Sequence, residues 1–370
     1  MDKSLVDDER TLKDFKGVTY SGYKVLEVVK RLIQGMIQEK IEVSCYWCAE
    51  LICSGHYMEL WELLFLYYTK YIHIANPKLC IYVATKLKRF RENMNDCESE
   101  QEQLNFRNEA GFRSLFIELV VIMCVSPKKY IVNNVRVSPN DFNMLTIKDI
   151  LQAPDLSFSE KLFKDDDPKE LMITVNEFSY NLSNEVSNTV RAYYWFEWVV
   201  EYAKMCKKQK QICRIQKREI DTVDEKHLAN PIWLIWEAIQ QEATKRGGIH
   251  EKIINSLFSI FILRYSDTMN TKRKFVVYYA ISILTTNIVF SEYEILKDKK
   301  ILTCVLGQLD KIFMQVKEKW ASIEKEKVNI ATTSDSNSEN TIISSSNPVT
   351  KSQEKLKILN IFETGFVPHI

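Results

Sequence analysis

Glycine and proline are scarce in this sequence, and no stretch stays apolar for long. The 370 residues include nine glycines and eight prolines, well below the average usage of roughly 7% and 5%. Few tight turns are therefore available, which favours long elements. The longest apolar stretches, 115–125 and 275–290, are short or interrupted, whereas a membrane-spanning helix needs ~18 residues or more. The sequence thus predicts no membrane association.

Neither sign of charge is in excess. The chain has 50 basic and 49 acidic residues, which leave a net charge of +1. Global charge therefore predicts no binding to nucleic acid, so any such binding must come from local clustering.

The cysteines and the N-terminus indicate the compartment. Nine cysteines are an odd number, and most lie in apolar helical contexts, as Cys124 and Cys304 do. Reduced, buried thiols in a cytosol-like compartment have this pattern. The N-terminal MDKSLVDDERTLKD has no signal-peptide segment. We therefore expect a cytoplasmic protein, or one of a viral factory or virion, that is not secreted.

Apolar residues recur at three- and four-residue steps along most of the chain and predict an all-α protein. The first helix follows Gly22, and the second, at 41–54, ends at Gly55. Further helices are expected at about 57–73, 77–93, 105–125, 187–218, 231–246, 249–264, 272–290 and 296–326.

Prolines and polar stretches divide the predicted fold into two helical lobes, arranged as a bundle or an array. In chain order we expect an N-terminal arm at 1–19, an N-terminal helical lobe at 20–125, an irregular connector at 126–168, a C-terminal helical lobe at 169–328, a disordered linker at 329–352 and a short docking tail at 353–370. The linker is too polar to form a core. The apolar residues after it favour docking of the tail onto a groove.

Two motifs in the predicted N-terminal lobe resemble a known family. The segments SCYWCAELICSG and TKYIHIANP are similar to the helical region behind the ATPase module of the RarA/MgsA and Werner-helicase-interacting AAA+ proteins. The residues that match are Tyr46, Trp47, Ala49 and Gly55 in the first motif and Ile72, Ile74, Ala75, Asn76 and Pro77 in the second. The resemblance covers about a fifth of the chain, at roughly 20–93.

This resemblance implies a clamp-loader-associated helical fold whose relatives serve oligomerisation and replication-fork maintenance. Lys70 and Tyr71 replace the family's acidic pair, and His73 replaces its glycine. The sequence has no GxxxxGK[ST] phosphate loop, so the family's ATP hydrolysis is not implied. We expect no catalytic residues and no cofactor. In the alternative, this region is a helical hairpin in which Trp47 packs in the core and Asn76 starts the next helix.

Two clusters contain residue types that bind metal ions, but their spacing favours other roles. The first is Cys45, Cys48, Cys53 and His56. On a continuous helix its ends would lie ~16 Å apart, too far for one tetrahedral zinc ion. The second, at 165–167, is three aspartates that lack the spacing of a calcium loop and precede Pro168. It is typical of a helix start. We therefore predict no metal site.

The predicted helix at 187–218 ends in a basic segment. Its cations are Lys204, Lys207, Lys208, Lys210, Arg214, Lys217 and Arg218. At ~100° per residue they cover about half of the helix circumference, opposite apolar side chains. Phosphate contacts need clustered lysines and arginines, so these residues are the candidate nucleic-acid surface. The alternative is a solvated face balanced by nearby acids, such as those in EIDTVDE.

Together these features predict a non-catalytic accessory or interaction protein that acts in DNA replication or repair. We expect it to bind a protein partner or a second copy of itself. The second hypothesis is a structural or scaffolding protein, such as a virion component of a large DNA virus. The bias towards Lys, Ile, Asn and Tyr is typical of an A+T-rich genome, as in a large DNA virus or a parasite. Salt-sensitive DNA binding would favour the first hypothesis.

The first prediction concerns Trp47. If its indole packs in the core, Trp47→Ala should lower the free energy of unfolding by ~3–5 kcal/mol. Thermal denaturation followed by circular dichroism measures this loss. An unchanged melting temperature together with loss of a partner would instead make Trp47 an exposed anchor.

Overall fold

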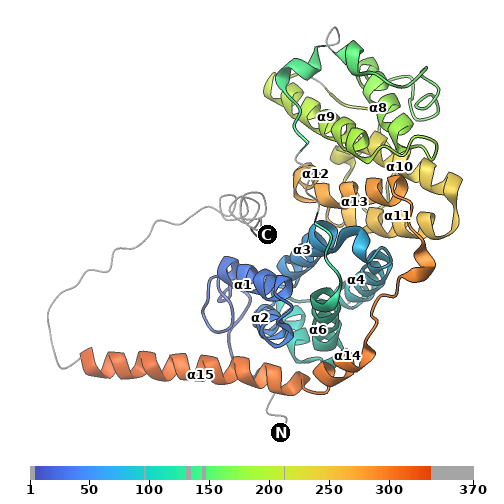
Figure 1. Cartoon of the computed structure of the whole chain (residues 1–370). Helices are drawn as coiled ribbons and strands as arrows, with labels where there is room; N and C mark the ends of the chain where they lie inside the picture. The colour runs from blue at the N-terminus through green and yellow to red at the C-terminus, as the bar shows by residue number, and fades with distance from the viewer. Residues whose placement is uncertain (1–4, 96, 131–134, 144–146, 212, 335–370) are drawn as a thin grey trace. The chain divides into compact units, whose positions relative to one another are not determined.

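Helices make up all the regular structure of the described chain. The computed structural model describes residues 5–95, 97–130, 135–143, 147–211 and 213–334. Figure 1 shows these helices. Within these ranges the one strand-like contact is an isolated antiparallel bridge between Val18 and Lys24. The predicted all-α class is confirmed. Among the same residues, no helix is both long and apolar enough to cross a membrane.

The chain forms two compact units, each built from separate stretches of sequence. Unit 1 combines Met1–Leu64, Arg89–Val125 and Asp298–Ile370, and unit 2 combines Phe65–Lys88 and Ser126–Lys297. This division differs from the predicted lobes, which were continuous in sequence. The difference arises because helices that are far apart along the chain pack on one another within each unit.

Unit 1 joins helices from both ends of the chain. Its helices are α1 (Val25–Ile37), α2 (Ile41–Cys53), α5 (Glu100–Asn105), α6 (Ala110–Val125), α14 (Lys299–Leu306) and α15 (Leu309–Ser334). Helix α2 packs against α1, α6 and α15, and α14 packs against α6. On α15, Phe313 and Val316 are fully buried, which explains why the end of the described chain belongs to this unit. Helices α3 (Tyr57–Tyr67) and α4 (Leu79–Asn95) contribute residues to both units.

Two glycines permit the close packing of unit 1. A Cβ atom on Gly35 would lie 2.6 Å from the Oγ atom of Ser44, so α1 and α2 can approach closely because that side chain is absent. Gly55, predicted to end α2, follows the helix with φ of +72°. A Cβ atom there would also lie 2.5 Å from the side chain of Leu12. Both positions favour glycine.

Aromatic side chains fill the core of unit 1. The Trp61 ring lies 5.6 Å from Phe90 and 5.2 Å from Phe116, centroid to centroid. Trp47 is 8% exposed, as expected of a core residue. The guanidinium of Arg31 lies 4.8 Å from the centre of its ring, an arrangement that adds a cation–π attraction to the burial.

The C-terminal helices differ from the single helix predicted at 296–326. Helix α14 ends at Leu306, where Gly307 is its cap, and α15 begins at Leu309. The predicted linker at 329–352 is wrong in its first residues, because α15 continues to Ser334. Extending an existing helix is easier than nucleating a new one, which accounts for the later end. Residues 335–352 of the linker and the docking tail at 353–370 lie outside the described residues.

Unit 2 is built around α8, α9, α10 and α13. Its helices are α8 (Lys169–Leu182), α9 (Thr189–Lys208), α10 (Ile232–Arg246), α11 (Gly248–Phe261), α12 (Met269–Lys272) and α13 (Lys274–Thr285), together with a π-helical turn, η1 (Tyr68–Ile72), and a 3-10 turn, η2 (His73–Ala75). Helix α8 packs against α9 and α10, α10 packs against α11, and α13 packs against α9, η1 and η2 (Figure 1). The contacts of α13 explain why residues after Leu64 join unit 2.

A buried carboxyl group ties the N-terminal turn of unit 1 to α2. Glu50 has no exposed surface. Its carboxylate oxygens accept hydrogen bonds from Ser21 N (3.1 Å), Ser21 Oγ (2.5 Å) and the Tyr46 hydroxyl (3.1 Å). Burial raises the pKa of Glu50, and the hydrogen bonds from Ser21 oppose this shift only in part. Folding therefore favours the protonated form, and the stability of the folded chain falls as the pH rises through this raised pKa.

The second prediction tests this carboxyl group. Glu50→Gln should lose less stability than the wild type as the pH rises from the ordinary pKa of glutamate, about 4.3, through the raised pKa of Glu50, because the amide does not ionise. Urea denaturation at several pH values measures the difference. Glu50→Ala is the contrasting variant, and it should lose roughly 1–3 kcal/mol because Ser21 N–H is left without its acceptor. Equal pH slopes for the wild type and Glu50→Gln would contradict the assignment.

Candidate functional site

The basic segment does not continue along one helix. Helix α9 ends at Lys208, ten residues before the predicted end of 218, so the prediction of a helical strip over 204–218 is wrong. The chain reverses where Gln211 N donates to Cys206 O (2.9 Å) and Lys210 takes a positive φ of 57°. Lysines that crowd the last turn also repel one another, which disfavours further helix.

Tertiary contacts draw the next residues away from the helix axis. Ile215 and Arg218 are each 3% exposed. Their backbone N–H groups donate to Ala229 O and Leu228 O, both at 3.0 Å. A continued α9 could not bury both side chains and make these bonds, so residues 213–218 run beside 228–229 instead.

Arg218 lies at the centre of a buried ionic network. Its guanidinium donates to Asp167 (2.7 Å from Nη2 to Oδ2), to Glu237 (2.8 Å from Nε to Oε1) and to the backbone oxygens of Leu162 and Gln216. The Asp167 side chain has no exposed surface. Two predictions are therefore corrected. Arg218 has a structural role and is not a phosphate ligand. Asp167 forms a buried ion pair with Arg218 and does not serve only at the start of a helix.

Asp167 carries its negative charge inside the protein. Burial alone would raise its pKa, but hydrogen bonds from Arg218 and from the backbone N–H groups of Lys164 and Gln216 lower the pKa below its ordinary value. These bonds join residues 164–167 to residues 216–218, so the network fixes the segment that carries the predicted cations.

The remaining six predicted cations separate into two groups. Lys204, Lys207, Lys210 and Arg214 line one pocket, whereas Lys208 and Lys217 do not. Lys217 pairs with Glu225, and Lys204 pairs with Glu201 at 2.7 Å. For these two lysines, nearby acidic residues balance the charge, as the alternative of a solvated face predicts.

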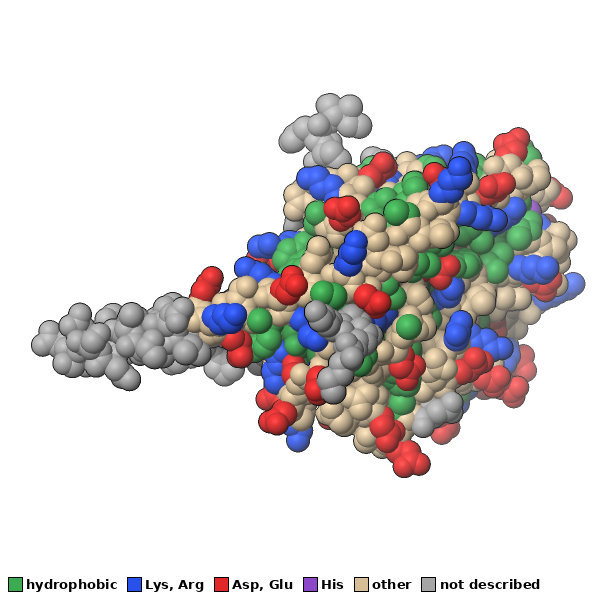
Figure 2. All heavy atoms as spheres, turned by 90° about the horizontal axis from the view of Figure 1, so that it is seen from below, with side chains coloured by type: hydrophobic (Ala, Val, Ile, Leu, Met, Phe, Trp, Pro, Cys, Tyr) green, Lys and Arg blue, Asp and Glu red, His purple; other side chains and the backbone are tan. Residues whose placement is uncertain are grey.

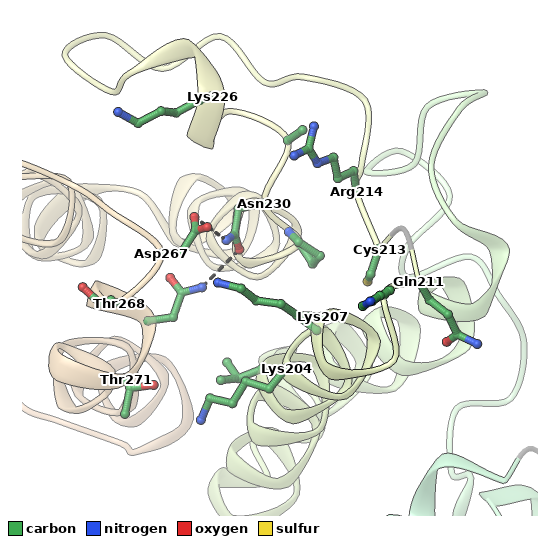
Figure 3. Close-up of a pocket in the computed structure, with 16 residues that line it drawn as sticks. Lys204, Lys207, Gln211, Cys213, Arg214, Lys226, Asn230, Asp267, Thr268 and Thr271 are labelled. Atoms are coloured by element: carbon green, nitrogen blue, oxygen red, sulfur yellow. Dashed lines mark hydrogen bonds between the residues drawn. The ribbon is translucent and has the colours of Figure 1, made fainter.

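The pocket is a cavity of about 790 Å³ in unit 2 (Figure 3). One wall is the last part of α9, from Val200 to Lys207, and residues 210, 211, 213 and 214 border it. Across from α9 lie residues 229–231, at the start of α10, and residues 267–271. Lys207 points from α9 towards Asn230 and Asp267 (Figure 3). Lys226, which the sequence did not single out, also lines the pocket, but its exposed ammonium pairs with Asp224 at 2.7 Å.

A hydrogen-bonded amide network holds the wall opposite α9. The Tyr265 hydroxyl donates to Asn270 Oδ1 (2.6 Å), and Asn270 Nδ2 donates to Asn230 Oδ1 (3.1 Å). Asn230 Nδ2 in turn donates to Asp267 Oδ1 (3.0 Å), which also lies 2.9 Å from His227 Nδ1. Asp267 is the one acidic residue among the described residues that line the pocket, and it is thus already hydrogen-bonded to two neighbours.

Positive charge is concentrated in this pocket. The five cations of the pocket are Lys204, Lys207, Lys210, Arg214 and Lys226. Within the described ranges, Lys207, Lys210 and Arg214 contact no carboxylate. A second cavity, of about 700 Å³, has Glu219, Asp221 and Glu237 on its wall. On the face drawn in Figure 2, acidic and basic side chains are intermixed.

The structure divides the family-motif residues between the two units. Tyr46, Trp47, Ala49 and Gly55 belong to unit 1, and Ile72, Ala75, Asn76 and Pro77 belong to unit 2. The side chain of Asn76 donates to Ser126 Oγ (3.2 Å) and to Ile295 O (3.0 Å). It therefore ties distant parts of unit 2 together, and does not act only at the start of α4.

The cysteine and histidine set of α2 is spread over different neighbours. Cys45, Cys48 and Cys53 are fully buried, whereas His56 Nε2 lies 2.8 Å from Val18 O. Among the residues that the structure describes, no group of three His, Cys, Asp or Glu side chains is placed to hold a metal ion.

Comparison of the chain with protein-family models, with curated proteins and with solved structures finds no match. The resemblance to the clamp-loader-associated region therefore rests on the two sequence motifs alone.

The third prediction tests the ionic network. Arg218→Ala leaves the carboxylate of Asp167 buried and unpaired, so the free energy of unfolding should fall by ~3–5 kcal/mol. Thermal denaturation measures it. Lys217→Ala is the matched control, because Lys217 makes an exposed ion pair with Glu225, and such pairs contribute little. Similar losses for the two variants would show that the network does not hold this region.

Proposed function

We propose that this chain is a non-catalytic accessory protein that binds nucleic-acid phosphates through the basic pocket of unit 2, in DNA replication or repair. The observation that carries the proposal is that Lys207, Lys210 and Arg214 line one pocket and contact no carboxylate within the described ranges. Asp267, the acidic residue among the described residues of the lining, is already hydrogen-bonded. Phosphate oxygens are the acceptors that clustered lysine and arginine side chains bind most strongly, because each contact is a charge-assisted hydrogen bond.

The helical surroundings add to the positive potential. The pocket includes residues 229–231, where α10 begins at Ile232. A helix N-terminus carries roughly half a positive charge, which favours a bound anion. The C-terminus of α9 borders the same pocket and carries a partial negative charge. Attraction to this helix end is therefore a structural explanation for the positions of Lys204 and Lys207. That reason does not extend to Arg214 and Lys226, which lie on other segments.

The role in replication or repair has a separate basis. It comes from the two motifs that resemble the clamp-loader-associated helical region, whose relatives act at replication forks. The same motifs support a protein partner or a second copy of the chain as a further ligand. Binding to nucleic acid is the part of the proposal that the pocket supports.

The fourth prediction tests phosphate binding with two variants of equal charge. The pocket variant is Lys207→Gln with Arg214→Gln, and the control is Lys208→Gln with Lys217→Gln, which lie outside the pocket. We expect the wild type and the control to bind a single-stranded oligonucleotide at low salt. The pocket variant should bind far more weakly, and the slope of log affinity against log salt should fall by about 0.7 for each lost phosphate contact.

Fluorescence anisotropy at several salt concentrations provides these slopes. Equal binding by the two variants would mean that net charge, and not the pocket, attracts the strand. If the wild type retains no nucleic acid even at low salt, the proposal is wrong. A loss of assembly in the pocket variant would then favour the scaffolding hypothesis.

A further inference from the structure

The shape of the basic pocket limits which part of a nucleic acid can enter it. Its volume of about 790 Å³ lies within the range of roughly 300–1,000 Å³ that is typical of small-ligand pockets. A DNA duplex presents its phosphates along a wide convex surface and cannot insert them into such a hollow. A few nucleotides of a single strand, or the end of a strand, can enter.

The lining of the pocket favours phosphate over base. Proteins that hold internal stretches of single strands combine cations with aromatic rings on which the bases stack. Here no described residue that lines the pocket is aromatic. Two amides, Asn230 and Asn270, are engaged with each other and with their neighbours. Recognition in this pocket therefore depends on charge.

Cations from three segments line the pocket. Lys204 and Lys207 extend from α9, Lys210 and Arg214 from the segment after it, and Lys226 from the segment before α10. Figure 3 shows Lys207 on one side of the hollow and Arg214 on the segment across from it, whereas the Lys226 side chain points away. Lys204 pairs with Glu201 and Lys226 pairs with Asp224, each at 2.7 Å. The cations of the pocket without a carboxylate partner in the described ranges are therefore Lys207, Lys210 and Arg214. Three positive charges without carboxylate partners in one pocket suit a compact, highly charged group better than an extended chain of single charges.

A terminal phosphate is the group in a nucleic acid that has this chemistry. A phosphate monoester carries a charge of about −1.5 to −2 near neutral pH and three strong acceptor oxygens, whereas each internal diester carries one charge. The N-terminus of α10 adds positive potential at the same place.

We infer that the pocket binds the terminal phosphate monoester of a single strand in preference to the internal diesters. This inference rests on the proposed function, because it assigns the part of the nucleic acid that the same site takes. It makes this chain a reader of strand ends, and the reaction that supplies its ligand is one that leaves a phosphorylated end, such as cleavage of a phosphodiester bond.

The fifth prediction compares strands that differ only at their ends. Single-stranded oligonucleotides of one sequence, labelled internally, carry a 5′-phosphate, a 3′-phosphate or hydroxyl groups at both ends. In anisotropy titrations with the full chain, we expect the strand with a 5′-phosphate or the strand with a 3′-phosphate to bind at least about tenfold more tightly than the hydroxyl strand. The reason is that the terminal phosphate adds a charged hydrogen-bond acceptor.

The two variants described above separate the pocket from the rest of the surface. The preference for the phosphorylated end should disappear in Lys207→Gln with Arg214→Gln and persist in Lys208→Gln with Lys217→Gln. Circular dichroism verifies that both variants are folded. A preference that persists in the pocket variant would overturn the inference.

Other outcomes distinguish this inference from the proposed function. If all three strands bind equally and with the same salt dependence, the inference is wrong but phosphate binding stands. If no strand binds, both are wrong. A nucleoside monophosphate is the competitor that distinguishes a strand end from a small phosphate ester as the ligand. If it displaces the strand fully at equal concentration, the pocket is a site for small phosphate esters, and the inference about strand ends is wrong.

Discussion

The buried contact of Arg218 with Asp167 is the constraint on which the candidate site depends. Arg218 donates to a fully buried carboxylate at 2.7 Å and to the less buried Glu237 at 2.8 Å. Each charge would be costly to bury alone, so the partners require one another. Because these partners lie 51 and 19 positions away in sequence, the pairing fixes the course of the chain from the end of α9 to the start of α10. Lys210 and Arg214 lie on that course and thereby border the pocket.

The same separation of structural and functional roles applies to the other charges of this region. Asp267 lines the pocket but is engaged by His227 and Asn230, and it therefore stabilises the wall. Lys207 and Arg214 make no such contact within the described ranges, which leaves them available to a ligand. A single basic segment in sequence thus supplies both a structural arginine and the cations of a pocket.

Several features of the fold could be read from local patterns. The end of α2 near Gly55 and the burial of Trp47 follow from helical periodicity and from the conformational freedom of glycine, and both act over a few residues. The candidate site was predicted only in part. Four cations were found because they cluster in sequence, whereas Lys226 is separated from them and gave no signal. The second half of the basic segment was assigned to a helix because nothing local marks Arg218 as buried.

The sequence by itself determined that this chain is helical and that a basic segment lies near the end of α9. Periodicity and composition express interactions between near neighbours, and those interactions survive in any packing of the helices. Only the tertiary structure decided which cations share a pocket, where α9 stops and which stretches join each unit. These outcomes depend on contacts such as Arg218 with Asp167, and of α15 with α2, whose free energy arises only when distant segments meet and exclude water.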